Sequence, residues 1–227
     1  MRVLGIDTST YYGSVAFIDD DSVLGEINLN IGPSHSERLL PAIGWLLASI
    51  GRDRNEIEGI SVSRGPGSFT ALRIGISTAK GIAFSLGVPI AGVSSLEVLA
   101  LNLAYPSYTV CSLIDARKKE VYASFFRYSR NKFDRLTEDM LITPQELIDK
   151  VSEETIFIGD GVTHYRGLIE DALGDRALFC PSSLNFPRAS NCAKLGISIL
   201  DGRSFSSIDE IHPHYLKKSV AEILKEG

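Results

Sequence analysis

The first thirty residues carry short apolar runs separated by polar residues, a pattern typical of β-strands. The runs span residues 2–6, 13–18 and 23–29, and Asp19-Asp20-Asp21-Ser22 separates the last two. Aspartate and serine favour turns, so the pattern predicts a meander of three strands.

After residue 34 the apolar residues recur at intervals of three and four, which is the spacing of one helix face. The predicted helix opens at Ser34, with Glu37 at the spacing of a capping box. Pro41 should kink this helix or move its start towards Leu39. The apolar face consists of Leu39, Leu40, Ile43, Leu46, Leu47 and Ile50.

The same order of elements is predicted twice along the chain. The remaining elements are strands at 60–63 and 90–93 and a helix at 68–86 in the first half, then strands at 109–114, 121–128, 141–142 and 155–158 and helices from Thr143, at 164–173 and at 188–201 in the second half. Two tandem βββαβα units predict an α/β protein of two lobes with a cleft between them. We expect a first lobe at 1–105, a smaller, degenerate second lobe at 106–205, and a last helix at 218–225 that returns to the first lobe.

A glycine-rich turn, Gly65-Pro66-Gly67, stands directly before the helix at 68–86. A phosphate-binding Walker A loop needs a lysine that this segment lacks, and Pro66 has no backbone N–H to donate. Ser68 is therefore predicted to be the N-cap of the helix. Small residues recur every four positions along that helix, and such a ridge lets another helix approach closely. The ridge, which could meet the chain's own core or a second chain, consists of Ala71, Gly75, Ala79 and Ala83.

The composition narrows the class of protein. The 227 residues carry a net charge of −5, whereas nucleic-acid binding relies on lysine and arginine neutralising phosphates, so direct binding of RNA or DNA is not expected. The three cysteines are scattered and are expected to be reduced and partly buried. We identify no signal peptide and no apolar run of membrane-spanning length, so a cytoplasmic protein without membrane contact is expected.

Ordered motifs from both halves resemble the TsaB family, also called YeaZ. The resemblance covers nearly the whole chain and is densest before residue 125, with Ala71 standing where the family usually has glycine. The motifs are Ile6-Asp7-Thr8-Ser9, His35-Ser36-Glu37 with Leu39-Leu40-Pro41, Gly65-Pro66-Gly67-Ser68-Phe69-Thr70 with Leu72-Arg73-Ile74-Gly75, Ser94-Ser95-Leu96-Glu97, Asp115-Ala116-Arg117 with Glu120-Val121-Tyr122, and Pro213-His214-Tyr215-Leu216-Lys217.

The resemblance implies the actin-like (ASKHA, ribonuclease H-like) two-lobed fold that hexokinases and heat-shock chaperones share. Members of the family help to form threonylcarbamoyladenosine at position 37 of tRNA. They pair with and activate TsaD, the transferase, and engage TsaE, a small ATPase, while a separate synthase supplies threonylcarbamoyl-AMP. The family resemblance therefore implies a non-catalytic subunit that forms a homodimer when alone and reaches tRNA only through the complex.

The residues of this chain argue against a metal-dependent catalyst. The catalytic relative binds its metal through a His-Leu-Glu-Gly-His run, in which histidines four residues apart share one ion. Ser95 and Leu99 stand at those two positions here, and leucine cannot bind a metal. No metal site is predicted from the histidines of the chain, which are His35, His164, His212 and His214.

An actin-like kinase would need a phosphate-holding turn in each lobe. Asp7-Thr8-Ser9 could be a vestigial cofactor-binding turn, or Asp7 could simply cap the end of its strand. In the second lobe, Asp115-Ala116-Arg117 has no glycine, and Gly159-Asp160-Gly161 resembles a degraded nucleotide turn that carries a negative charge. We expect no cofactor on this chain alone and leave open a nucleotide at a complex interface.

The resemblance also implies pairing through the helix after His35 and the helix after Gly67. On that basis the small-residue ridge is assigned to a partner, and Ala79→Leu is expected to break pairing in a folded monomer. The predicted interface residues are His35, Leu39, Leu40, Ile43, Leu47, Leu72, Gly75, Ile76 and Ala79. Two other functions stay open at this point: an actin-like small-molecule kinase, and a homodimeric binding module with an unrelated partner.

Overall fold

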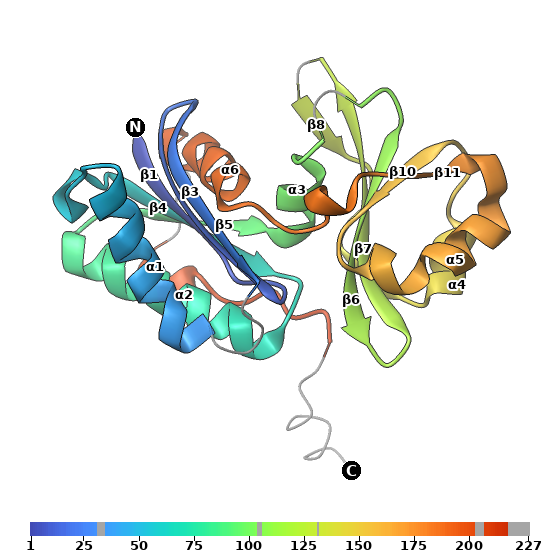
Figure 1. Cartoon of the computed structure of the whole chain (residues 1–227), viewed down its shortest axis with the longest axis horizontal. Coiled ribbons are helices and arrows are strands. Elements are labelled where there is room, and N and C mark those ends of the chain that lie inside the picture. Colours follow the sequence, from blue (N-terminus) through green and yellow to red (C-terminus); the bar gives the residue numbers. More distant parts are fainter. Residues whose placement is uncertain (31–34, 104–105, 131, 203–206, 218–227) are drawn as a thin grey trace, which may run out of the picture.

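The computed structural model describes residues 1–30, 35–103, 106–130, 132–202 and 207–217. It consists of two β-sheets side by side, each covered by helices (Figure 1). The predicted helix at 218–225 and the predicted N-cap residue Ser34 lie outside the described residues.

The first sheet has five strands in the order β3-β2-β1-β4-β5. The predicted meander is confirmed, because β1 pairs antiparallel with β2 and β2 pairs antiparallel with β3. The next two strands, β4 and β5, run parallel to β1. The bounds are β1 (Arg2–Asp7), β2 (Tyr12–Asp19), β3 (Ser22–Asn30), β4 (Gly59–Gly65) and β5 (Ile90–Ser94).

Helices cover both faces of the first sheet. Side chains alternate across a strand, so Leu4 and Ile6 of β1 face α1 (His35–Ser49) and α2 (Phe69–Leu86), which pack side by side. Val3 faces α6 (Ala189–Asp201) on the opposite side of the sheet (Figure 1).

The position of α6 corrects the predicted second lobe of 106–205, which included this helix. The Oγ of Ser61, in β4, donates a hydrogen bond to the carbonyl oxygen of Cys192 at 2.6 Å. A Cβ at Gly5 would overlap the carbonyl oxygen of Ala189, so the helix backbone lies directly on β1. The physical reason is that the central strands are apolar on both faces, and α1 and α2 cover only one of them.

The second sheet repeats the strand order of the first. Its order is β11-β10-β6-β7-β8, and β9 also pairs with β7, so the third strand of the repeat is split into β8 and β9. Of these strands, β8 and β11 are not predicted from the sequence. The bounds are β6 (Thr109–Arg117), β7 (Glu120–Ser129), β8 (Lys132–Arg135), β9 (Met140–Ile142), β10 (Thr155–Ile158) and β11 (Ala177–Phe179).

Three helices cover this second sheet. The pair α4 (Pro144–Asp149) and α5 (Gly161–Leu173) packs on the outer face, and α3 (Ser95–Ala100) packs on the face towards the first lobe. The Thr143 capping box is confirmed, because its Oγ1 accepts from the Glu146 N–H at 3.2 Å and Glu146 accepts from the Thr143 N–H at 2.7 Å. The local signal was strong because both hydrogen bonds form within four residues.

Of two local predictions about helix starts, one needs correction and the other is confirmed. The first helix, α1, begins at His35 and continues through Pro41, so a start nearer Leu39 is wrong. Ser68 occupies the N-cap position of α2, and its carbonyl accepts from the Leu72 N–H at 2.9 Å, but its side chain makes no capping bond with a described residue. Among the residues that the structure describes, no helix is long and apolar enough to cross a membrane.

Candidate functional site

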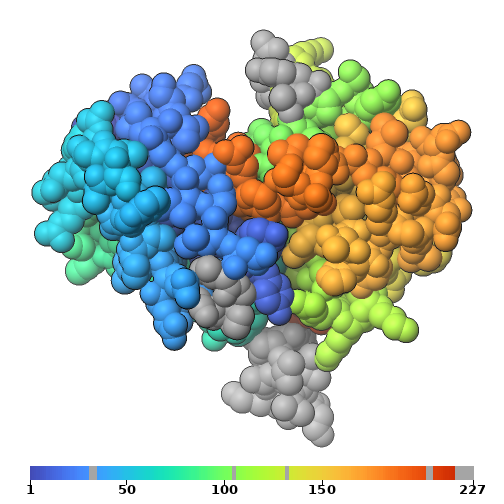
Figure 2. Space-filling view, viewed as in Figure 1, coloured from blue at the N-terminus to red at the C-terminus, as the bar shows by residue number. Residues whose placement is uncertain are grey.

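The carboxyl ends of β1, β4 and β5 lie together because these strands are parallel neighbours. Ligands of open α/β sheets bind outside such strand ends, so a binding site is expected at this edge of the sheet. The edge faces the second lobe, since the Oγ of Ser94, at the end of β5, donates to Asp139 at 3.2 Å. In Figure 2 the two lobes are in contact, and the orange segment that leads into α6 lies between them.

Asp7, Thr8 and Ser9, at the end of β1, are fully buried. Asp7 accepts hydrogen bonds from the backbone N–H of Ser9 at 2.9 Å and from its hydroxyl at 2.8 Å, and its other oxygen accepts from Ser63. Burial raises the pKa of Asp7, and the hydrogen bonds from Ser63 and Ser9 oppose that shift. This is an Asx-type strand cap, so the geometry favours the structural role of Asp7 over a vestigial ligand role.

The glycine-rich turn before α2 closes over the turn that follows β1. The Ser68 N–H donates to the carbonyl oxygen of Ser9 at 2.7 Å, and a Cβ at Gly67 would overlap that same oxygen. Gly65 adopts a φ of +112°, a conformation that favours glycine. The segment therefore packs against the end of β1, and its Ser68 N–H is already used by the Ser9 carbonyl.

The corresponding turn of the second lobe holds two carboxylates. The half-buried Asp160 accepts from the Asp115 N–H at 3.0 Å, and burial raises the pKa of Asp160 to about 6. Arg117 forms an ion pair with Asp115 at 3.2 Å, and its guanidinium lies 5.3 Å from the centre of the Tyr11 ring in the first lobe. A phosphate at this turn would meet negative charge, as expected from the sequence.

The two positions that match metal-binding histidines in the catalytic relative belong to the core. Ser95 and Leu99 are fully buried, and Leu99 packs against the second sheet. Nearby, the guanidinium of Arg135 bonds to Glu97 and Asp139. No group of three or more His, Cys, Asp or Glu side chains that could hold a metal occurs in the described part of the chain.

Most of the predicted interface residues lie inside the first lobe rather than on its surface. A Cβ at Gly75 would overlap the Oγ1 of Thr8, so the small-residue ridge packs on the chain's own β1 turn. We therefore correct their assignment: the spacing identifies the buried face of each helix, but not what covers it. The buried eight are His35, Leu39, Ile43, Leu47, Leu72, Gly75, Ile76 and Ala79.

The outer face of the same two helices carries exposed apolar side chains. Leu40, the ninth predicted residue, is 57% exposed, Trp45 is 65% exposed and Phe84 is 81% exposed. A Cβ at Gly44 or Gly81 would meet no described atom within 4 Å. The sequence contained a signal for this face, since Trp45 and Phe84 are apolar residues that do not fit the spacing of the core face. We call Leu40, Gly44, Trp45, Gly81 and Phe84 the α1–α2 surface.

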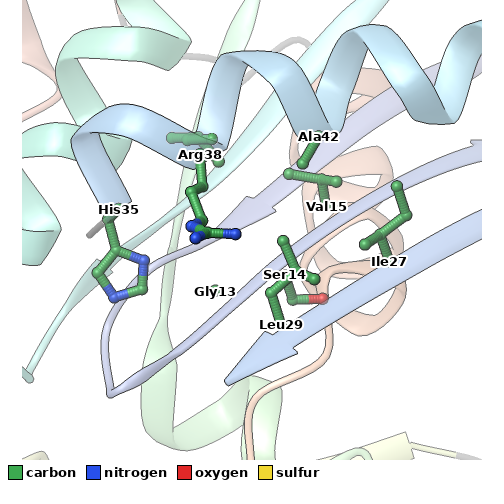
Figure 3. Close-up of a pocket in the computed structure, with 9 residues that line it drawn as sticks. Gly13, Ser14, Val15, Ile27, Leu29, His35, Arg38 and Ala42 are labelled. Carbon is green, nitrogen blue, oxygen red and sulfur yellow. The ribbon is translucent and has the colours of Figure 1, made fainter. Parts of the chain in front are cut away.

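Two hollows border α1: the smaller lies between α1 and the strands β2 and β3, and the larger lies between α1 and β3. In the smaller one, His35 and Arg38 point from α1 towards Ser14 and Leu29 (Figure 3). Its volume of about 10 Å³ is room for about one water and not for a metabolite. The Nδ1 of His35 has no hydrogen-bond partner among the described residues. The larger hollow is an open groove of about 530 Å³ that Trp45 borders.

Comparison with known proteins connects this site to a family. Residues 29–225 match the family model described as TsaD, tRNA N6-adenosine threonylcarbamoyltransferase. The chain is 32% identical to the tRNA threonylcarbamoyladenosine biosynthesis protein TsaB of Bacillus subtilis, over 98% of this chain and 96% of that protein.

Solved structures show the same fold. YeaZ from Pseudomonas aeruginosa superposes with a TM-score of 0.80 at 27% identity, over 95% of this chain and 99% of that one. The ROK hexokinase from Thermus thermophilus superposes with a TM-score of 0.50 at 11% identity, over 89% of this chain and 100% of that one, which bears on the fold alone. The expected actin-like, two-sheet α/β fold is therefore confirmed.

Proposed function

Because the chain belongs to the TsaB (YeaZ) family of tRNA threonylcarbamoyladenosine biosynthesis proteins, we propose that it is a non-catalytic subunit of a threonylcarbamoyl transferase complex. It pairs with and activates a TsaD-like transferase and engages a TsaE-like ATPase in the cytoplasm. It reaches tRNA only through the complex, a role that fits its net charge of −5.

The observation that carries the non-catalytic role is the closed strand edge between the lobes. Asp7 is fully buried beneath the turn before α2, and Ser95 and Leu99 fill the core where the catalytic relative has metal ligands. This arrangement supports a chain that contributes to the reaction through a partner.

The partner is proposed to bind the α1–α2 surface, and a second copy of the chain binds there when the partner is absent. Exposed aromatic side chains, such as Trp45 and Phe84 on these two neighbouring helices, are typical of contact surfaces. Because Gly44 and Gly81 carry no side chain, a partner helix can approach α1 and α2 near the lower end of the usual 8–10 Å range.

The test is threonine incorporation into unmodified tRNA by purified TsaD, TsaE and the adenylate synthase, with and without this chain. We expect product only when the chain is present, and no ATP hydrolysis by the chain alone. Equal product without the chain would overturn the proposal. If the chain alone hydrolyses ATP and Asp7→Asn abolishes that hydrolysis, the actin-like small-molecule kinase is supported instead. If the chain forms a dimer but has no effect on threonine incorporation, a homodimeric binding module with an unrelated partner is supported.

Surface variants test where the partner binds. Phe84→Ala and Trp45→Ala should each weaken the complex with TsaD about 30-fold, since truncating an interface hot spot costs about 2 kcal/mol. Tyr108→Ala is the matched control, because Tyr108 is 40% exposed and lies in the second lobe. Unchanged affinity of both α1–α2 variants would place the partner elsewhere.

A further inference from the structure

The segment at 207–217 begins in the first lobe. Ile211 is buried in the core cluster of that lobe, and its Cδ1 would lie 3.3 Å from a Cβ at Gly92 in β5. The backbone N–H of His214 donates to the carbonyl oxygen of Arg64, near the end of β4, at 2.7 Å. The segment therefore runs across the carboxyl ends of β4 and β5.

Tyr215 fastens this segment to the start of α2. Its ring stacks on the ring of Phe69, with the ring centres 4.4 Å apart. Its hydroxyl accepts a hydrogen bond from the Nε of Arg73 at 2.8 Å, and the Arg73 guanidinium lies 4.1 Å from the Phe69 ring centre. Stacking, a cation–π contact and a charge-assisted hydrogen bond thus converge on one side chain.

The next two residues belong to the second lobe. Leu216 packs against the apolar cluster that contains Ile114 and Tyr122. The Nζ of Lys217 donates to Glu120 at 2.5 Å and to the carbonyl oxygen of Ala116 at 3.1 Å, both at the turn between β6 and β7. The chain therefore passes from one lobe to the other within three consecutive residues.

A polar junction lies beside this crossing. Asp139 of the second lobe accepts from the Oγ of Ser94 in the first lobe and forms an ion pair with Arg135. The Nε2 of His214 is 4.0 Å from the same carboxylate. The segment thus also lies beside a polar link between the lobes.

We propose that residues 211–217 form a strap that holds the two lobes at one angle. Relative motion is the usual behaviour of two lobes unless a large apolar interface joins them. Here Ile211 and Tyr215 contact the first lobe, whereas Leu216 and Lys217 contact the second. A rotation of the second lobe must therefore break the Lys217 contacts or pull Tyr215 from α2. This inference concerns the chain alone and does not depend on the proposed function.

Spin labels on the two lobes would measure the angle directly. Asp21→Cys in the β2–β3 turn and Lys150→Cys after α4 place exposed thiols on the first and second lobes. The native thiols are buried and have raised pKa values, so the reagent should modify the introduced ones. Pulsed electron spin resonance, with labelled chains diluted by unlabelled ones, then gives the distribution of distances between lobes.

The strap variant is Tyr215→Ala with Lys217→Met, and we expect its distance distribution to widen about two-fold, as for lobes that move freely. Tyr108→Ala with Lys194→Met, which changes an exposed tyrosine and an exposed lysine outside the strap, should keep the parent's width. An unchanged width in a folded strap variant, or equal widening in the control, would overturn the proposal. If circular dichroism shows that the double variant does not fold, the single variant Lys217→Met is used instead. We expect its distance distribution to widen as well, and an unchanged width would refute the strap.

Discussion

Two glycines in the interior of α2 should respond in opposite ways to the same substitution. A Cβ at Gly75 would overlap the Oγ1 of Thr8, whereas a Cβ at Gly81 would meet no described atom within 4 Å. Both residues lie on one helix six positions apart, so the intrinsic effect of alanine on the helix is the same for both. The difference between Gly75→Ala and Gly81→Ala therefore isolates the packing of α2 against the turn after β1.

The magnitudes follow from the surroundings of each residue. Alanine stabilises a helix interior by about 1 kcal/mol relative to glycine, so Gly81→Ala should raise the free energy of unfolding by up to that amount. At Gly75 the methyl group must displace Thr8, which is fully buried and donates a hydrogen bond to the Ala71 carbonyl at 2.7 Å. Overpacking costs about 1–3 kcal/mol and a lost hydrogen bond about 1 kcal/mol. After the helix gain, Gly75→Ala should lower the stability by about 1–3 kcal/mol.

Urea unfolding followed by circular dichroism measures both values. The free energy of unfolding and the denaturant slope are compared with those of the parent chain, at a protein concentration at which size-exclusion chromatography shows only monomer, because Gly81 belongs to the α1–α2 surface and a dimer would gain apparent stability. If Gly75→Ala proved as stable as Gly81→Ala, the close packing of α2 on Thr8 would be refuted.

Further predictions concern buried groups. Asp160 has its pKa raised from 3.8 to about 6 by burial, so its contribution to stability is present below pH 3.8 and is lost as the pH rises through about 6. Urea unfolding at several pH values should show that the free energy of unfolding of the parent chain falls by up to about 3 kcal/mol between pH 4 and pH 7, and that Asp160→Asn removes this fall. The same pH dependence in the parent and in Asp160→Asn would contradict the prediction. Ala79→Leu, at a fully buried position, should lower the free energy of unfolding by about 1–3 kcal/mol, whereas an interface position would leave that free energy unchanged and lose only the pairing. A monomeric Ala79→Leu chain with the free energy of unfolding of the parent would show that Ala79 is an interface residue.

Much of the architecture was predictable because its signals are local. The turn at residues 19–22, the apolar face of α1 and the capping box of Thr143 depend on neighbours within a few positions. The turn and the capping box are confirmed, and so is the apolar face except for Leu40, which is exposed. The repeated order of strands and helices predicted two similar lobes for the same reason. The family motifs added the actin-like fold, which composition and periodicity alone do not specify.

Contacts between distant residues were decided only by the tertiary structure. Asp7 is buried by groups such as Ser63, which is 56 positions away, and Gly75 is required by Thr8 in another element. Likewise α6 lies on the first sheet although it follows the second along the chain. Hydrophobic spacing depends on the geometry of one helix or strand, so it identifies the face that is buried. What covers that face depends on how the whole chain packs, and for this reason eight residues predicted to meet a partner belong to the core.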